Sequence, residues 1–178
     1  KKGGMMATTK LKFYKHNPEV ITPTFATKES ACFDISSHFR KEIISLWLDD
    51  RDDKQGRPTR QGSDGRWYAL IYPNERMLIP TGLTLDIPKG YSVRLHVRSS
   101  VALKKGLLLA NSTGIIDSDY VDPLYFMLVN TGNTARQVLS DERYVQAELI
   151  KTLNHSLEEI SEAPEQKTDR EGGFGSTG

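Results

Sequence analysis

The sequence has one cysteine, almost no net charge and no long apolar run. The lone Cys32 excludes an internal disulfide and supplies no metal-ligand spacing, so a reducing compartment is expected. A formal net charge of +1 argues against the basic surface that proteins use to neutralise nucleic-acid phosphates, so no stable nucleic-acid binding is expected. No apolar segment approaches the roughly 20 residues of a membrane span, and the first residues lack the apolar stretch of a signal peptide. We expect a cytoplasmic protein without a membrane partner, in the host cytoplasm if a phage or virus encodes it.

Short segments of alternating polarity fill most of the chain, separated by Gly, Pro, Asn or Asp. The segment 91–97 alternates with period two, and the Pro-Lys-Gly before it is a turn signal. Segments of this length and spacing predict one all-β domain, a sandwich, barrel or jelly roll. Only 100–105 is typical of a helix, with a serine placed to cap it. The expected strands are 11–15, 76–82, 83–87, 91–97, 107–109, 114–116, 124–129 and 144–150.

A charged segment, 49–66, interrupts this pattern. It holds five acidic and five basic side chains with Gly and Pro and almost nothing apolar. This composition predicts a solvated loop inside a hairpin whose arms are 43–48 and 67–72. A tolerated surface insertion and a surface for a protein partner are both open interpretations of it.

The C-terminal segment, 161–178, is polar and ends in a glycine-rich stretch with one aromatic residue, Phe174. Glycines permit close approach to a ligand, Ser and Thr supply hydroxyls, and the phenyl ring supplies a flat face for a base or sugar. The alternatives are a disordered end and an arm that orders over a ligand. The expected organisation is a flexible end or cloning remnant at 1–9, a β-barrel domain at 10–160 and a flexible arm at 161–178.

Two internal segments carry side chains suited to a phosphorylated ligand. Arg98, Ser99 and Ser100 lie where a strand gives way to the short helix, and a guanidinium with two hydroxyls beside free helix N–H groups suits a phosphate, although serine there is also ordinary capping. Asp117 and Asp119 flank one serine, so in an extended chain both carboxylates point to the same side. Two such carboxylates can orient and deprotonate a water, or can serve a turn by accepting backbone N–H bonds.

Other catalytic patterns are missing from the sequence. It has no Gly-x-x-x-x-Gly-Lys phosphate loop and no Gly-x-Ser-x-Gly elbow. The histidines lack ligand spacing, which argues against a catalytic zinc site; they are His16, His38, His96 and His155.

Taken in chain order, five segments resemble the five motifs of the trimeric dUTP diphosphatase (dUTPase) family. The third, Asn-Ser-Thr-Gly-Ile-Ile-Asp-Ser-Asp-Tyr, matches closely, and the fifth, Gly-Gly-Phe-Gly-Ser-Thr-Gly, matches almost letter for letter. The five segments are 30–35, 98–100 with 104–106, 111–120, 143–146 and 172–178.

The resemblance implies a jelly-roll or distorted β-barrel homotrimer that hydrolyses dUTP to dUMP and pyrophosphate with Mg²⁺ bound to the triphosphate. This reaction removes dUTP from the nucleotide pool and supplies dUMP for thymidylate synthesis. The three active sites are expected at subunit interfaces, each closed by a C-terminal arm.

The resemblance also implies a role for each matching residue. Asp117 is the general base that holds the attacking water at the α-phosphorus, and Asp34 touches the metal only through water. Uracil is bound in a hairpin slot too narrow for the methyl group of thymine, and Tyr120 packs on the deoxyribose where a 2′-hydroxyl does not fit. The nucleoside contacts are Asn111, the backbone at Ile115 and Ile116, Tyr120 and Tyr125. The phosphate contacts are Arg98, Ser99, Ser100, Arg143 and Gln146. In the arm, Phe174 stacks on uracil, and the other contacts are Arg170, Gly175, Ser176 and Thr177.

The chain departs from the family pattern at four places, one of which is the interval between the first and second motifs, lengthened by 49–66. Ser100 stands where the family usually has Gly, and Val121-Asp122 stands where Arg-Gly or Gln-Gly is common. Arg170 precedes Phe174 by four residues instead of the usual five, which leaves its contact with the γ-phosphate open.

Two alternatives accompany this interpretation. The related dCTP deaminases share the fold and the Arg-Ser-Ser spelling, but they place a catalytic Glu where this chain has Met127, which cannot transfer a proton; deamination, alone or combined with hydrolysis, is therefore disfavoured. The second alternative is a regulatory protein of the same fold that binds a partner through 49–66, with nucleotide as the switch.

Overall fold

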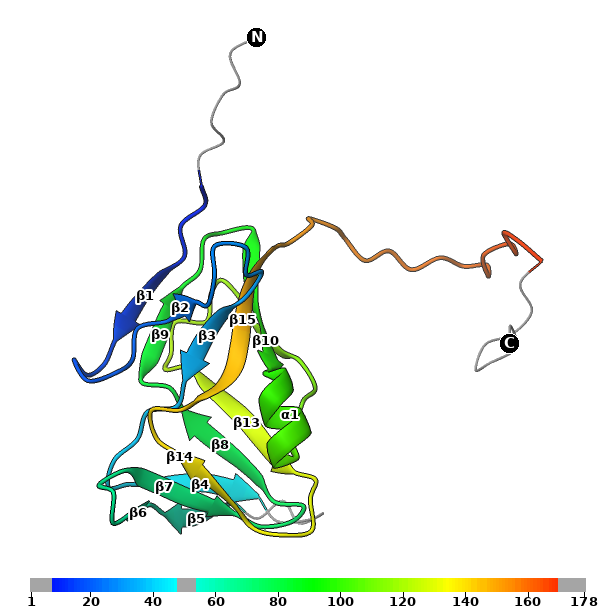
Figure 1. Cartoon of the computed structure of the whole chain (residues 1–178). Coiled ribbons are helices and arrows are strands. Elements are labelled where there is room, and N and C mark those ends of the chain that lie inside the picture. The colour runs from blue at the N-terminus through cyan, green and yellow to red at the C-terminus, as the bar shows by residue number, and fades with distance from the viewer. Residues whose placement is uncertain (1–7, 48–53, 170–178) are drawn as a thin grey trace.

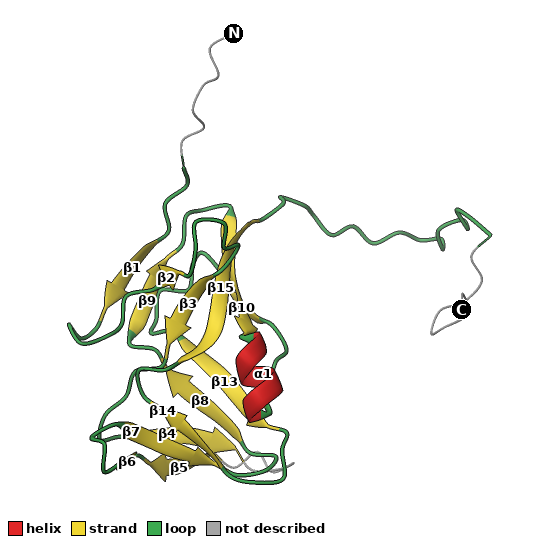
Figure 2. Cartoon of the chain, in the orientation of Figure 1, coloured by secondary structure: helices red, strands yellow, loops and turns green. Residues whose placement is uncertain are grey.

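Antiparallel strands and one short helix make up the regular structure of the described residues (Figure 2). The computed structural model describes residues 8–47 and 54–169. The elements in chain order are β1 (Lys12–Lys15), β2 (Thr24–Phe25), β3 (Phe33–Ser36), β4 (Ile43–Trp47), β5 (Lys54–Pro58), β6 (Arg60–Gln61), β7 (Trp67–Ile71), β8 (Arg76–Pro80), β9 (Leu83–Asp86), β10 (Tyr91–Val97), α1 (Ser99–Lys105), β11 (Leu107–Leu109), β12 (Gly114–Ile116), β13 (Tyr125–Asn130), β14 (Arg136–Leu139) and β15 (Arg143–Lys151).

Two five-stranded sheets form the body of the molecule. One has the order β12-β10-β15-β3-β2 and occupies the upper part of Figure 1, and the other has the order β11-β13-β8-β4-β5 below it. A three-stranded sheet, β14-β7-β6, and a two-stranded sheet, β1-β9, complete the fold, and the strand pairings are antiparallel. The expected all-β fold with one short helix is therefore confirmed. The homotrimer stays a prediction.

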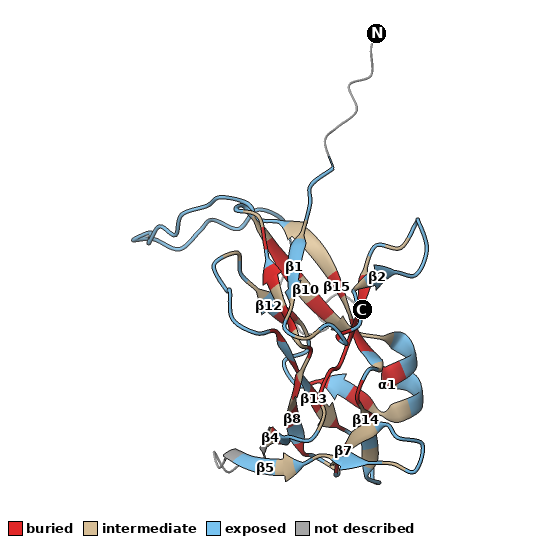
Figure 3. Cartoon of the chain, turned by 90° about the vertical axis from the view of Figure 1, so that its left-hand side faces the viewer, coloured by how far each residue is buried: buried red, intermediate tan, exposed pale blue. Residues whose placement is uncertain are grey.

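The core lies where the apolar faces of the sheets meet (Figure 3). In β10, Val93 and Leu95 are buried, whereas the next residue after each, Arg94 and His96, is only partly buried. Side chains of a strand alternate between its two faces, which gives burial this period of two. Phe126 of β13 and Tyr144 of β15 join the two large sheets, with ring centroids 6.1 Å apart. Each fully buried side chain of this size contributes about 1.5–3 kcal/mol. The largest are Tyr144, Phe39, Ile35, Ile71, Met77, Ile79, Leu83, Leu95, Leu107, Leu124 and Leu128.

The helix α1 begins at Ser99, one residue earlier than expected, and the expected serine cap is wrong. Arg98 holds the N-cap position in an extended conformation and makes no side-chain cap bond, because a guanidinium has only donors and cannot accept from the helix N–H groups; it pairs with Asp34. The helix ends at Gly106, whose φ of 63° is the left-handed conformation that favours glycine, and the Gly106 N–H donates to the Ala102 carbonyl.

The charged segment 49–66 is not the simple loop that its composition predicts. The strand β4 pairs with β5 and β8, and β7 pairs with β6 and β14, so the two expected arms do not pair with each other. Strand pairing needs backbone N–H and C=O groups, which polar residues also supply. The strands β5 and β6 thereby extend two sheets at their edges.

One buried ion pair fastens this insertion to the body of the domain. The Arg57 guanidinium lies 2.5 Å from an oxygen of Glu75, whose other oxygen accepts the Tyr72 N–H at 2.7 Å. The same guanidinium lies over the Tyr72 ring, 4.7 Å from its centroid. Glu75 is only 6% exposed, so Arg57 supplies the charge that this carboxylate needs.

Candidate active site

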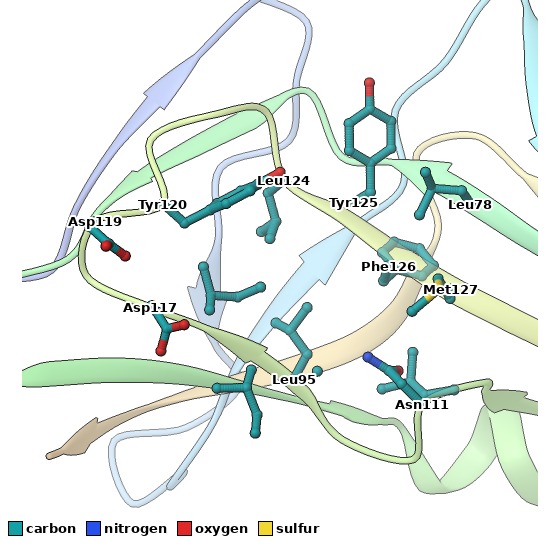
Figure 4. Close-up of a pocket in the computed structure, with 14 residues that line it drawn as sticks. Leu78, Leu95, Asn111, Asp117, Asp119, Tyr120, Leu124, Tyr125, Phe126 and Met127 are labelled. Atoms are coloured by element: carbon teal, nitrogen blue, oxygen red, sulfur yellow. The ribbon is translucent and has the colours of Figure 1, made fainter.

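A cavity of about 520 Å³ lies between the β10–β12 strand pair and the start of β13 (Figure 4). Its walls are mostly apolar, with polar groups at the ends, as is usual for small-molecule sites. Figure 4 shows Asp117, Asp119 and Tyr120 at one end and Asn111 with Met127 at the other. The lining residues are Leu78, Leu95, Leu109, Asn111, Gly114, Ile115, Ile116, Asp117, Asp119, Tyr120, Leu124, Tyr125, Phe126 and Met127.

Close packing fixes the floor of this cavity. Gly114 faces Leu95 in the β10–β12 register, and a Cβ at position 114 would lie 3.1 Å from the Leu95 Cβ. A larger residue at 114 would therefore push the two strands apart. The turn before it is equally tight, because Ser112 has a φ of 57° and the Thr113 N–H donates to the Asn111 carbonyl at 2.6 Å. This turn presents Asn111 to the cavity.

A second turn brings the two carboxylates to the cavity. The strand β12 ends at Ile116, and the Tyr120 N–H donates to the Asp117 carbonyl at 3.2 Å. Of the two interpretations of 117–119, the structure shows a turn, and both acids line one cavity. The carboxylates of Asp117 and Asp119 are exposed at its rim.

Tyr120 is held by its hydroxyl, which donates to the Pro123 carbonyl at 2.9 Å. Burial, followed by the nearby Asp122 and Tyr125, raises the pKa of this phenol. The Tyr125 hydroxyl points away from Asp117 and Asn111 (Figure 4). The hydrogen bond to Pro123 fixes the ring of Tyr120 at the carboxylate end of the cavity.

A second hollow, of about 400 Å³, gathers the charged candidates. Asp34 of β3 is 9% exposed and bridges two arginines: one oxygen lies 3.0 Å from the Arg98 Nε and the other 3.0 Å from a terminal nitrogen of Arg143. We call Asp34, Arg98 and Arg143, with the hollow beside them, the arginine corner. The hollow is lined by Ala26, Ser30, Ala31, Cys32, Asp34, Arg98, Ser99, Ser100 and Gln146.

The sequence analysis did not name Cys32 and Ser30 as site residues, because the only signal for that role was membership of the segment 30–35. Burial, and then the carboxylates of Glu148 and Asp34, raise the pKa of the Cys32 thiol. The apolar cavity walls, such as Leu78 and Phe126, were also missed as site residues, since they are indistinguishable in the sequence from other core positions.

The carboxylate end of the cavity and Arg98 lie toward opposite ends of β10, whereas Leu95, which also lines the cavity, precedes Arg98 by only three residues. The register pairs Ile116 with Val93, which places Asp117 opposite Ser92, and Arg98 follows six residues later. At about 3.3 Å per residue, the backbone positions of Asp117 and Arg98 are about 20 Å apart along the strand. Figure 3 accordingly shows β12 and α1 on opposite sides of the molecule.

The structure thus divides the sequence-predicted residues into two groups. The cavity takes Asn111, Ile115, Ile116, Asp117, Tyr120 and Tyr125, and the arginine corner takes Asp34, Arg98, Ser99, Ser100, Arg143 and Gln146. The arm residues Arg170, Phe174, Gly175, Ser176 and Thr177 lie outside the described residues.

Two absences apply to the described part of the chain. No helix within it is long and apolar enough to cross a membrane. Within the same residues, no three His, Cys, Asp or Glu side chains gather as a metal site.

Comparison with known proteins identifies one family. The dUTPase family model matches residues 66–178. A deoxyuridine 5′-triphosphate nucleotidohydrolase of Nautilia profundicola is 35% identical over 95% of this chain and 99% of its own length. One from Bdellovibrio bacteriovorus is 39% identical over 62% of this chain and 73% of its own length. Among solved structures, the dUTPase of Staphylococcus bacteriophage 80alpha with dUPNHPP superposes with a TM-score of 0.72 at 20% identity, over 96% of this chain and 99% of the other.

Proposed function

This chain belongs to the dUTPase family and is a dUTP diphosphatase, and we propose that Asp117 activates the water that attacks the α-phosphorus of dUTP. The observation that carries this proposal is a mostly apolar cavity of about 520 Å³ with an exposed carboxylate at one end and an amide at the other. The water oxygen forms a bond to the α-phosphorus, the bond from that phosphorus to the bridging oxygen breaks, and pyrophosphate leaves. The proton of the water passes to Asp117.

The base and sugar fit the cavity in one direction. Uracil lies at the Asn111 end, where the side-chain amide and the backbone at Ile115 and Ile116 bind its polar edge. The deoxyribose then packs on Tyr120, which leaves the α-phosphate beside Asp117. Met127 lines the same cavity and carries no transferable proton, which supports hydrolysis over deamination.

The phosphates fit the arginine corner, with Arg98 and Arg143 as guanidinium donors and Ser99, Ser100 and Gln146 beside them. One chain holds the backbone of Arg98 about 20 Å from that of its own Asp117, farther than the α- and γ-phosphates of one nucleotide are from each other. A second copy of the chain must therefore bring its corner to the cavity of the first. This supports an oligomer with sites between subunits, and the family resemblance makes that oligomer a homotrimer.

The C-terminal arm completes the proposed site. Phe174 stacks on uracil, while Gly175, Ser176 and Thr177 reach the phosphates, with Arg170 near the γ-phosphate. The preceding segment supports this role, because residues 153–169 are exposed along their whole length and run away from the sheets (Figure 1).

The dUTPase family typically uses Mg²⁺, and the residues present fit such an ion on the triphosphate. Mg²⁺ keeps several waters and takes phosphate oxygens with one or two carboxylates. Both oxygens of Asp34 already face arginines, which suits a contact through water. When bound, the ion offsets the phosphate charge that repels the nucleophile.

The first test is pyrophosphate release from dUTP, dCTP, dTTP and UTP in parallel, with Mg²⁺ and with a chelator. We expect rapid, Mg²⁺-dependent release from dUTP alone. Release from dCTP, or equal release from all four, would overturn the proposed cavity. Binding of dUTP without release of pyrophosphate would mean that the protein binds the nucleotide but does not hydrolyse it.

Mixed oligomers test whether two chains share one site. Asp117→Asn removes the base, and Arg98→Met removes a guanidinium from the corner. If each site takes these residues from different chains, mixing the two inactive variants under subunit exchange restores about a quarter of the sites. If one chain supplies both residues, the mixture stays inactive.

A further inference from the structure

A carboxylate at the start of β15 ties the end of α1 to a buried tyrosine. One oxygen of Glu142 lies 2.5 Å from the Lys105 Nζ, and the other accepts the Tyr144 hydroxyl at 2.6 Å. The Tyr144 oxygen also accepts the Leu139 N–H at 2.8 Å, and the Lys105 ammonium lies 4.9 Å from the ring centroid. We call Lys105, Glu142 and Tyr144 the helix anchor.

The helix anchor is directly connected to the arginine corner. The Arg98 N–H donates to the Tyr144 carbonyl at 3.0 Å, so the backbone of Tyr144 holds the start of α1. The Tyr144 hydroxyl, through Glu142, also holds the end of α1. Arg143 lies between Glu142 and Tyr144 in the chain, and its guanidinium meets that of Arg98 on Asp34. The hydroxyls of Ser99 and Ser100 and both guanidinium groups are therefore set by the same short segment.

The helix depends on these ties for its orientation. It has seven residues, no side-chain cap and one buried side chain, Val101. Isolated helices of this length are not stable in water, so contacts with neighbours must hold it. Tyr144 is fully buried, which makes the anchor rigid, and its desolvation, followed by Glu142, raises its pKa.

We propose that Lys105, Glu142 and Tyr144 are positioning residues that align the arginine corner with the triphosphate. This inference rests on the proposed function, because it assigns the corner to phosphates. A shift of the helix by about 1 Å misplaces phosphate ligands enough to lower binding and turnover without affecting a nucleoside held in a separate cavity.

The helix offers a matched control. Lys104 has the same charge and neighbours Lys105, but it is exposed, and no ion pair or hydrogen bond is recorded for its ammonium in the described structure. We compare Lys105→Met, Lys105→Arg and Lys104→Met for the affinity of dUMP and of the non-hydrolysable triphosphate dUpNHpp, and for kcat and KM with dUTP.

We expect Lys105→Met to weaken dUpNHpp binding and raise KM by about tenfold, the effect of one charged hydrogen bond, with dUMP affinity nearly unchanged. Lys105→Arg should recover most of the loss, and Lys104→Met should match the unaltered protein. Equal dUpNHpp affinity in both methionine variants overturns the inference. An equal loss for dUMP and dUpNHpp also overturns it, since that result describes general structural support.

A second variant guards against misfolding of the first. Tyr144→Phe keeps the ring and removes only the hydroxyl, so Glu142 and the Leu139 N–H each lose one partner. It should show the same selective loss for dUpNHpp with a smaller amplitude, and an unchanged dUMP-to-dUpNHpp affinity ratio contradicts the anchor. If the unaltered protein fails to bind dUpNHpp, the proposed function fails instead, and the two failures are distinguishable.

Discussion

The hairpin cavity and the arginine corner are built by different forces. The cavity has an apolar floor fixed by close packing, and its polar groups come mainly from one stretch of chain, 111–127. The corner comes from three distant segments held together by one buried carboxylate, Asp34. Packing over a short stretch suits a rigid ring with a fixed shape. Paired charges suit a flexible, charged triphosphate, because the arginines are aligned before the ligand arrives.

The largest expected effect is on the cavity. Asp117→Asn keeps the size of the side chain and removes its capacity to take the proton of the water, so kcat should fall by about a thousandfold. Affinity for dUpNHpp should remain, because the arginine corner is untouched. Steady-state kinetics with calorimetry measures both quantities.

Asp119→Asn is the control for that change. It alters a carboxylate at the same end of the cavity but leaves the proposed base in place, so its loss of kcat should be much smaller. Near-normal turnover in Asp117→Asn would remove this residue from the mechanism.

Truncation before Gly172 tests whether the two regions need the arm to act together. Activity should fall by about a hundredfold, since water then enters the site and the uracil loses its stacking partner. Light scattering should still report the same oligomer. Collapse of the oligomer would make the arm a structural element instead of a lid.

The sequence predicts the cavity better than the corner, for a physical reason. Strand alternation and turn residues are local, so β10, β12 and β13 and the candidates Asn111 and Asp117 could be named from neighbours in the chain. The bridge from Asp34 to Arg98 and Arg143 depends on contacts across more than 60 residues, which no local pattern records. The roles of all these residues came from the resemblance to the dUTPase family.

The strands inside 49–66 could not be predicted for the same reason. Their composition is that of a loop, and what orders Arg57 is a carboxylate that follows 18 residues later, at Glu75. The described part of this insertion extends two sheets at their edges, and its use as a surface for a protein partner stays a prediction.

Arg57 extends the comparison of cavity and corner, because like Arg98 it pairs with a buried carboxylate but lines neither the cavity nor the hollow of the arginine corner. Arg57→Met leaves Glu75 buried and unpaired, so the free energy of unfolding should fall by about 2–3 kcal/mol, somewhat below the loss for a fully buried pair. Turnover of the folded protein should not change. Arg60→Met, on the exposed strand β6, is the control and should change neither quantity. A loss of activity at unchanged stability would mean that the insertion takes part in the reaction.

The smallest expected effect is on the rate at which Cys32, beside the arginine corner, is alkylated. Cys32 is the one cysteine of the chain and lines the hollow beside Asp34, so alkylation followed by mass spectrometry reports this position alone. Its raised pKa means that less thiolate is present at a given pH than in a free cysteine. Cys32 should therefore react more slowly with iodoacetamide near pH 8, and its reaction should accelerate as the pH rises further.

Bound dUpNHpp should slow this alkylation by a further factor of about three, because the triphosphate covers the hollow and adds negative charge beside the thiol. Deoxyuridine, which has no phosphates, should leave the rate unchanged. Equal protection by deoxyuridine and dUpNHpp would mean that the hollow does not hold the phosphates, and the division of the site into a packed cavity and a charged corner would then be wrong.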